Sequence, residues 1–416
     1  MATISNPSAV ISAVPVASGS VRTQPQRLVS VDLLRGLIMV IMALDHVRDY
    51  FTSATFQPED LSRTNGVLFL TRFITHFCAP TFALLAGTGA YLAVSRGKSV
   101  QEVSRFFWTR GLWLVFLEFT VVGFAWTFST PYAFALVIWS LGVSMILMAA
   151  LVRLPVRWIA VFGIVMIVGH NLLDGISPDS LGKFSWLWTI LHSPGMVMIK
   201  PPDFGVEVLY ALVPWVGVMA CGYALGAVLT RPDHRKLVLQ IGIGLTLAFF
   251  ILRGINLYGN GTAGYPFSIG PWKAQSSLTL TLISFFNTQK YPPSLDYLLM
   301  TLGPALIVLS LFNGVKAERG VGRFLLVFGR VPMFYYLLHI YLVHSMAIVV
   351  AWLSHQPAAW LWHGAVFLNR PPDGWGFGLP FIYFIWALAI AILYLPCRWY
   401  MEFKRQHRDW AWLSYV

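Results

Sequence analysis

Long runs of apolar residues, separated by shorter polar segments, occupy most of the chain and define the expected fold. Most of the runs come close to the roughly 20 residues that an α-helix needs to cross a bilayer. Ten spans are predicted, at residues 28–48, 66–94, 106–128, 131–151, 156–172, 207–229, 237–257, 295–314, 324–350 and 377–400. The second is longer than a bilayer requires, so we expect it to tilt or to begin at the interface. The pattern predicts an all-α, polytopic transmembrane bundle of about ten spans.

Composition agrees with this pattern. Of the 416 residues, 57% are hydrophobic and 11% are charged, whereas a soluble domain carries about 25% charged residues. The net charge of +12 could suggest a nucleic-acid partner, but no basic run suits a phosphate backbone. We therefore expect membrane lipids around the protein and no nucleic acid.

The basic residues also predict an orientation. Lys and Arg gather in alternate loops and in the C-terminal region, at 95–105, 153–157, 231–236, 316–323 and 398–408. By the positive-inside rule these segments, and both termini, face the cytoplasm. The opposite loops are poorer in Lys and Arg, and three of them are long. We expect a multi-pass protein of the cytoplasmic (inner) membrane, with His46 at the outer face and Arg35 at the inner one.

One domain accounts for nearly the whole chain. Residues 1–26 lack a charged segment followed by an apolar one, so they are predicted to be a disordered cytoplasmic tail rather than a signal peptide. Residues 27–404 form the predicted transmembrane domain, and residues 405–416 a cytoplasmic tail. The three scattered cysteines form no disulfide framework.

The first span carries ionisable residues at both ends of one stripe. Arg35 and His46 are eleven residues apart, so on a helix they lie within about 20° of one another and about 16 Å apart along the axis. Asp32 precedes Arg35 by three residues, which lets the two side chains pair. Either the stripe faces an internal passage where chemistry occurs, or Asp32 and Arg35 form a structural ion pair and His46 is an ordinary interfacial residue.

The stretch RLVSVDLLRGLIMVIMALDHVRDYF (Arg27 to Phe51) resembles the start of the catalytic domain of heparan-α-glucosaminide N-acetyltransferase-like proteins. The spacing from Arg35 to His46 also resembles the R-x10-H signature of membrane acyltransferases that O-acetylate surface glycans. In those families the first-helix histidine is the proposed catalytic residue. The lysosomal member of the heparan-α-glucosaminide N-acetyltransferase family resembles this chain but has Asn at the position of His46, and its catalytic histidine lies in the following loop. This chain has no histidine between His46 and His76, so that loop residue has no counterpart.

Further stretches resemble a bacterial branch of the same family, so the resemblance spans most of the chain. These are RFITHFCAPTFALLAGTGAYL (Arg72 to Leu92), RGLWLVFLE (Arg110 to Glu118), GHNLLD (Gly169 to Asp174), LVPWVGVMACGYALG (Leu212 to Gly226) and GRVPMFYYLLHIYLVH (Gly329 to His344). We expect the small residues of the fourth stretch to allow close helix packing.

The resemblance implies transfer of an acetyl (acyl) group from cytoplasmic acetyl-CoA to an extracytoplasmic sugar or glycan. His46 would act as base or brief acetyl carrier, with Asp45 or another carboxylate fixing its tautomer. Arg35, with Asp32 and Arg110, would hold the CoA phosphates. The expected partners are acetyl-CoA, a carbohydrate acceptor and lipids. No metal is expected, and a homodimer is left open.

Other candidates lie on later spans. Arg72 and His76 share a helix face and, with Arg48, are expected to wall the acceptor site opposite His46, where His76 is a further catalytic candidate. The alternative is an interface helix with an arginine that reaches the headgroups. Pro80 is expected to free a backbone carbonyl and kink this helix.

Three more ionisable residues have two interpretations each. Glu118, in the middle of the third span, either orients His46 or binds Arg35 as part of the catalytic group, or is a protonated carboxyl bonded to a neighbouring helix. His339 and His344, on the ninth span, either contact substrate or are satisfied core histidines.

Two other functions compete with acyl transfer. A transporter or exporter without covalent chemistry would favour inverted repeats and broken helices, and neither is evident. A haem-bearing electron carrier would need paired histidines on neighbouring helices, and no repeated spacing supports it.

Overall fold

The computed structural model describes residues 28–129, 133–201, 204–261, 269–315, 317, 319–362, 365–368, 371–407 and 409–415. The predicted tail at 1–26 lies outside the described residues. The segment predicted as the C-terminal tail follows the last helix and includes a short 3-10 helix, Ala411–Ser414.

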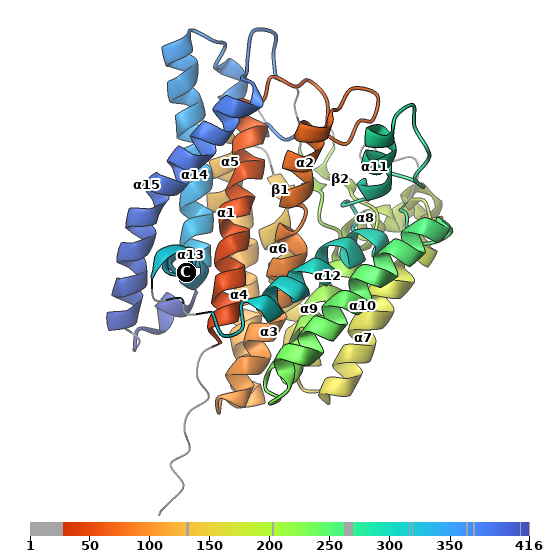
Figure 1. The fold of residues 1–416 in the computed structure, drawn as a ribbon, viewed down its shortest axis with the longest axis vertical. Helices are drawn as coiled ribbons and strands as arrows, with labels where there is room; N and C mark the ends of the chain where they lie inside the picture. The colour runs from red at the N-terminus through yellow and green to blue at the C-terminus, as the bar shows by residue number, and fades with distance from the viewer. Residues whose placement is uncertain are drawn as a thin grey trace, which may run out of the picture.

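Helices dominate the described chain (Figure 1). In chain order they are α1 (Val29–Phe51), α2 (Gly66–Thr75), α3 (Cys78–Ser95), α4 (Val100–Leu117), α5 (Gly123–Thr127), α6 (Val137–Leu151), α7 (Val156–Gly169), α8 (Ser185–Leu191), α9 (Leu212–Leu229), α10 (His234–Ile255), α11 (Leu278–Phe286), α12 (Leu295–Leu311), α13 (Gly320–Arg330), α14 (Pro332–Ser354) and α15 (Leu379–Gln406). A short π-helical segment, Glu118–Val122, joins α4 to α5. The predicted all-α polytopic bundle is confirmed.

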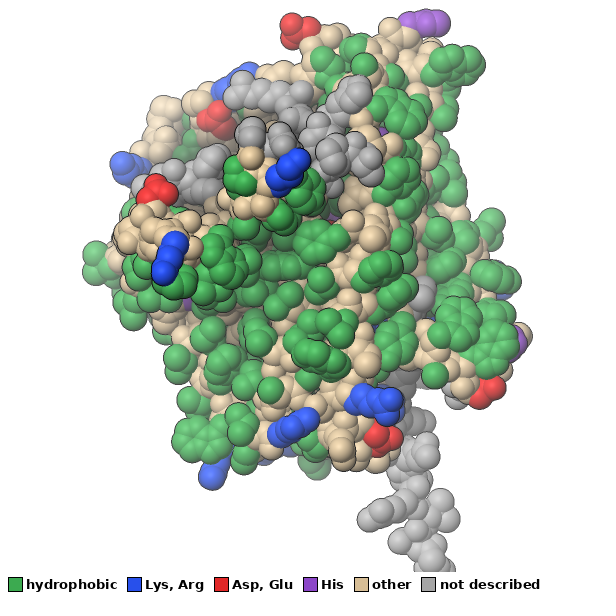
Figure 2. Space-filling view, turned by 180° about the vertical axis from the view of Figure 1, so that it is seen from behind, with side chains coloured by type: hydrophobic (Ala, Val, Ile, Leu, Met, Phe, Trp, Pro, Cys, Tyr) green, Lys and Arg blue, Asp and Glu red, His purple; other side chains and the backbone are tan. Residues whose placement is uncertain are grey.

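Seven helical segments of the described chain are long and apolar enough to cross a membrane: Gly66–Ser95, Val100–Thr127, Val156–Leu173, α9, α10, α14 and α15. Helices α6 and α12 are apolar but shorter. Apolar side chains cover the middle of the face drawn in Figure 2, and Lys, Arg, Asp and Glu lie mainly near its upper and lower edges. This distribution suits a bilayer around the bundle. The exact number of crossings and the side of the termini stay predictions.

Several predicted boundaries differ from the structure. The span 324–350 is two helices, because the chain breaks at Val331 before Pro332, which begins α14. In the spans 131–151 and 207–229, extended backbone precedes the helix. There β1 (Ala133–Ala135) pairs in parallel with β3 (Phe204–Val208), and β2 (Gly195–Lys200) pairs antiparallel on the other edge of β3. An apolar run shows burial, but not which parts of it are helical.

Helix α1 lies in the middle of the bundle, between the α13, α14 and α15 group and α3 (Figure 1). Its backbone touches that of α13, because a side chain at Gly36 would overlap the Leu325 carbonyl and one at Gly329 would overlap the Asp32 carbonyl. Gly222 of α9 meets the Leu84 carbonyl of α3 in the same way, which confirms the predicted close packing. The first residues of α1 and the C-terminal segment lie at the same end of the bundle.

The predicted distortion before Pro80 is also confirmed. Helix α2 ends at Thr75 and α3 begins at Cys78. Proline lacks the N–H that would bond the carbonyl four residues earlier, which belongs to His76. The Tyr297 hydroxyl of α12 donates to that carbonyl at 2.7 Å. The hydrogen bond ties the break between α2 and α3 to α12.

Candidate active site

Two histidines from distant parts of the chain meet at the C-terminal half of α1. His46 Nδ1 lies 2.6 Å from His339 Nε2 of α14, and the rings stack at 4.9 Å between centroids. Trp126 sets its ring against His46 edge-on, at 4.9 Å. His339 is completely buried and His46 is half-buried. Of the pair, only His46 is therefore open to a reactant.

Backbone carbonyls determine where the protons of this pair lie. His339 Nδ1 faces the Tyr336 and Tyr335 carbonyls at 2.6 and 3.2 Å, and a carbonyl only accepts, so Nδ1 carries the proton. A neutral His339 then accepts at Nε2, and His46 must donate from Nδ1. His46 Nε2 is left with a free lone pair. The arrangement therefore presents a base at a defined atom.

A charged cluster lies next to the pair, at the C-terminal end of α1. The Asp45 carboxylate accepts two hydrogen bonds from Arg72, at 2.7 and 2.8 Å, and lies 3.0 Å from Arg48. Arg72 also donates to Glu59 at 2.7 Å, and Arg48 to Asp49 at 2.6 Å. Each guanidinium is held by two carboxylates, which is how buried charges are tolerated. The cluster fixes the end of α2 against α1.

Glu59 comes from the loop between α1 and α2. Burial alone would raise its pKa, but the Arg72 guanidinium and the nearby His76 hold the pKa of this carboxyl well below its usual range. His76 Nε2 lies 3.6 Å from the Glu59 carboxylate. Glu59 therefore stays ionised at neutral pH, and its carboxylate holds the Arg72 guanidinium in position.

A cavity of about 1180 Å³ lies towards the opposite end of α1, where that helix begins. Its lining includes six basic side chains: Arg35, Lys98, Arg110, Arg330, Lys404 and Arg405. Apolar residues of α1, α3, α4 and α6 and the C-terminal segment complete it. Small-molecule sites commonly have about 300–1,000 Å³, so the cavity has room for a ligand of cofactor size that carries negative charge.

The cavity and the histidine pair approach each other through Tyr336. Arg35, Met39 and Tyr336 line the cavity, but His46 is not among its described lining residues. The Tyr336 ring lies 5.3 Å from that of His339. Of the predicted stripe on α1, the cavity therefore borders the N-terminal part, at Arg35 and Met39. His46 therefore lies outside this cavity, with Tyr336 and His339 between them.

Three residues predicted to bind the cofactor, Asp32, Arg35 and Arg110, lie near the N-terminal end of α1. Arg35 donates to Asp32 and to the Gly329 carbonyl, both at 3.3 Å. Arg110 donates to the Ser414 carbonyl of the C-terminal segment. The predicted pairing of Asp32 with Arg35 is present, and Arg35 also faces the cavity, so both interpretations of this residue describe part of the structure.

Other predicted residues lie elsewhere or act differently. Asp45 binds arginines rather than His46, whose tautomer is set through His339; the prediction that Asp45 orients His46 is wrong. Glu118 accepts from the Trp139 backbone N–H at 2.7 Å, at the start of α6. It contacts neither His46 nor Arg35, so the neighbouring-helix interpretation describes it.

His344 is held by backbone carbonyls on both sides. Its Nδ1 lies 2.8 Å from the Ala125 carbonyl and its Nε2 2.9 Å from that of Leu361, and Phe128 stacks on the ring at 3.8 Å. No ring nitrogen is left to bind substrate. These contacts favour the interpretation of His344 as a satisfied core histidine, which ties α14 to α5.

Sequence reasoning missed residues whose only signal is their position in space. Trp126, Tyr336 and Glu59 gave no pattern, and His339 was considered alone rather than as the partner of His46. The buried Lys290, which precedes Tyr291 in the loop after α11, acts electrostatically on both Asp45 and His46.

The fold and this site are those of a membrane-embedded helical protein with a histidine base and a basic cavity. Residues 27–255, more than half of the chain, match the family described as "Heparan-alpha-glucosaminide N-acetyltransferase, catalytic". The chain belongs to this family, as the resemblance of the first span indicated. No curated protein matches the chain.

Proposed function

We propose that the protein is a membrane-bound acetyltransferase of the cytoplasmic membrane. It takes the acetyl group from acetyl-CoA on the cytoplasmic side and transfers it to a sugar or glycan on the opposite side. The observation that carries the proposal is the His46–His339 pair, which leaves one imidazole nitrogen free as a base at a half-buried position. Membership of the acetyltransferase family supports it independently.

The basic cavity is the proposed acetyl-CoA site. CoA carries its phosphates at one end and the acetyl thioester at the other. Arg35, Arg110 and Arg330 suit the phosphates, since guanidinium groups bind phosphate oxygens in paired, charge-assisted hydrogen bonds. The apolar wall around Met39 and Tyr336 suits the uncharged arm. The thioester would then point along α1 towards His339 and His46.

His46 supplies the base in the proposed reaction. The acceptor hydroxyl or amine gives its proton to His46 Nε2 while its oxygen or nitrogen attacks the thioester carbonyl carbon. The carbon–sulfur bond breaks, and His46 returns the proton to the departing thiolate. The products are free CoA and the acetylated acceptor. As His46 becomes positive, its Nδ1–H bond to His339 strengthens, which stabilises the charged intermediate state.

Tyr336 has a gating role in this scheme. It lines the cavity and packs edge-on against His339. The thioester must pass this ring to reach His46, so the Tyr336 side chain has to rotate when the donor binds. A transporter would have no need of a base with a fixed tautomer, and no described feature favours that function over acyl transfer.

The experiment compares wild type with His46→Ala and with His355→Ala, which alters an exposed histidine after α14. Membrane vesicles receive radiolabelled acetyl-CoA and glucosamine, and the host's surface glycans are weighed by intact-mass analysis. We expect His46→Ala to lose about 10²–10⁴-fold in transfer rate, while gel filtration and CoA binding stay normal. Near-normal transfer by that variant would refute the role of His46.

A further inference from the structure

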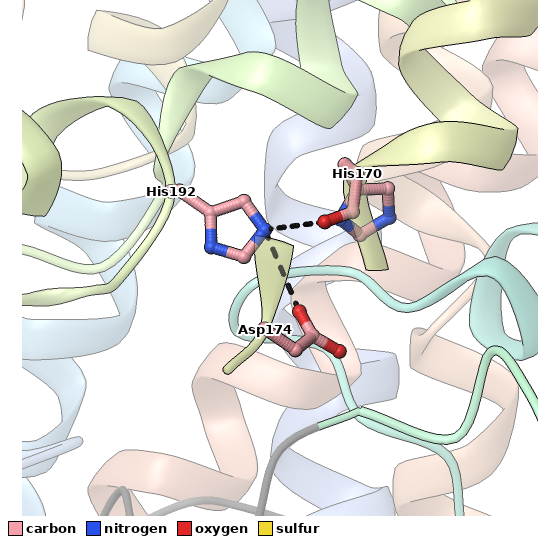
Figure 3. A group of neighbouring side chains, drawn as sticks. All are labelled: His170, Asp174 and His192. Atoms are coloured by element: carbon pink, nitrogen blue, oxygen red, sulfur yellow. Dashed lines mark hydrogen bonds and ion pairs between the residues drawn. The ribbon is translucent and has the colours of Figure 1, made fainter. Parts of the chain in front are cut away.

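A second group of ionisable side chains lies apart from His46, in the loop region after α7. His170 and Asp174 stand four residues apart on the turn that ends α7, and His192 follows α8. Figure 3 shows the three side chains converging from these two segments. One ligand atom of each lies within 4.8 Å of the other two. His170 and His192 are buried, with 1% and 3% exposure.

Several polar atoms in this group lack a good hydrogen-bond partner among the described residues. Both ring nitrogens of His170 are buried and make no well-formed hydrogen bond within the described chain, and buried Oδ1 of Asp174 has only a 3.5 Å contact with His192 Nε2. A buried polar group without a hydrogen-bond partner destabilises the folded state. The two His170 nitrogens and the weakly held Asp174 oxygen lie at one place, which indicates that a bound ligand satisfies them.

The surrounding residues hold the group in position. The Asn171 amide donates to Asp174 Oδ2 at 2.8 Å, which leaves Oδ1 directed towards the histidines, and Asn171 itself accepts from the Leu295 N–H at 2.9 Å. Trp188 stacks on the His192 ring at 5.1 Å and donates to the Ile176 carbonyl at 2.9 Å. Partners that orient ligand side chains in this way are typical of metal sites.

We propose that His170, Asp174 and His192 bind a divalent transition-metal ion of the Zn²⁺ class. Two imidazoles and one carboxylate are a ligand set that Zn²⁺ accepts, with a fourth position left for water. His192 Nε2 now faces the His170 carbonyl at 2.9 Å and Asp174 Oδ1 at 3.5 Å. Binding moves its proton to Nδ1 and frees Nε2 for the ion.

The geometry needs only a modest adjustment. Bonds of 2.0–2.2 Å in a tetrahedral site place neighbouring ligand atoms roughly 3.3 Å apart. The ligand atoms here lie within 4.8 Å, so they must approach by no more than about 1.5 Å. Rotation of the three side chains supplies this movement, because the Asp174 side chain retains some exposure and only one of its oxygens is held.

The ion would join three elements that the chain otherwise connects by loops. It links the end of α7 to the segment after α8, and through Asn171 it reaches the start of α12. Its role is thus to fix this end of the bundle. This structural role of the ion does not depend on the proposed acyl transfer. The sequence predicted acetyl-CoA as the sole cofactor, so the metal site is an addition to that prediction.

The test uses the full-length protein, purified in detergent with a tag that lacks histidine, from cells grown with added zinc. Mass spectrometry of metals should find about one Zn²⁺ per chain in the wild type. We expect His192→Gln and Asp174→Asn to lower this content by more than about tenfold. His355→Gln is the control, since that exposed histidine lies outside the group, and it should keep the ion.

A spectroscopic arm covers variants that fold poorly. Cobalt(II) in place of zinc should give the visible bands of a tetrahedral site, and Asp174→Cys should add a thiolate-to-cobalt charge-transfer band in the near ultraviolet. Wild-type protein with almost no bound zinc after this growth, and no cobalt spectrum, would overturn the proposal. So would equal metal content in the wild type, His192→Gln and Asp174→Asn.

Discussion

At the residue scale, a histidine acts as a base only through a nitrogen that carries no proton, and its neighbours decide which one that is. For His46 the decision begins at the backbone carbonyls of Tyr335 and Tyr336 and passes through His339. A carboxylate partner would add a negative charge. A neutral imidazole fixes the tautomer without one.

This arrangement makes His339 a positioning residue that can be tested separately from His46. His339→Leu removes the acceptor for His46 Nδ1–H and should lower the rate constant for transfer about fivefold, since one hydrogen bond is worth about 1 kcal/mol. His339→Gln restores an acceptor and should recover most of the rate. In the double variant with His46→Ala, the Leu substitution should cost nothing further. Additive losses would contradict the coupling.

Glu59 yields a prediction about pH and stability. Its folded-state pKa lies below its ordinary value, so its ion pair with Arg72 stabilises the protein above the unfolded pKa of about 4.3 and is lost as pH falls further. Glu59→Gln removes this contribution. Thermal unfolding should therefore separate wild type from variant most at neutral pH, and less as the pH drops below about 4. A difference that grows in acid would show that the pair does not stabilise the fold.

At the scale of elements, the contact between α1 and α13 depends on two small residues. Gly36 and Gly329 let the backbones touch, and this contact helps to hold the helix that carries both Arg35 and His46. Sequence spacing placed those two residues on one stripe, because helical periodicity is a local property. It could not identify His339 as the partner, since the phase and contacts of α14 are set only when the helices pack.

Packing against α13 predicts a specific sensitivity. Gly36→Ala places a methyl group against the Leu325 carbonyl, and overpacking of this kind costs about 1–3 kcal/mol. Gly244→Ala is the matched control in α10, where an added methyl group meets nothing within 4 Å and helix propensity should even improve. Thermal unfolding in detergent measures both. Equal stability of the two variants would contradict the close contact.

At the scale of the whole molecule, the bundle separates a basic cavity at one end of α1 from a histidine base nearer the other. The apolar runs of the sequence predicted the spans and the fold class, because burial in lipid or in a bundle leaves a strong local signal. They did not predict the cavity, whose lining joins α1, α3, α4, α6, α13, α14, α15 and the C-terminal segment. Glu118 shows the same limit, because a polar residue within a span does not indicate whether it serves chemistry or a helix end.

The cavity predicts an electrostatic effect on the donor. Lys98→Gln removes a basic side chain from the lining and should raise the KM for acetyl-CoA about threefold, with kcat unchanged and a weaker dependence on salt, since partly exposed charges contribute about 0.2–1 kcal/mol. Lys200→Gln, at the exposed end of β2, is the control and should leave KM unchanged. Steady-state kinetics at two salt concentrations decide between these outcomes. An unchanged KM in Lys98→Gln would place the donor elsewhere.

In the proposed reaction the acetyl group passes along α1 from one side of the membrane to the other. This passage is tested most directly in sealed proteoliposomes of a single orientation, selected by capture of a C-terminal tag, with radiolabelled acetyl-CoA and glucosamine supplied on chosen sides. We expect labelled N-acetylglucosamine when acetyl-CoA is on the side of Arg35 and glucosamine on the other, and none with His46→Ala. Product that forms only when both reactants share one side would contradict it.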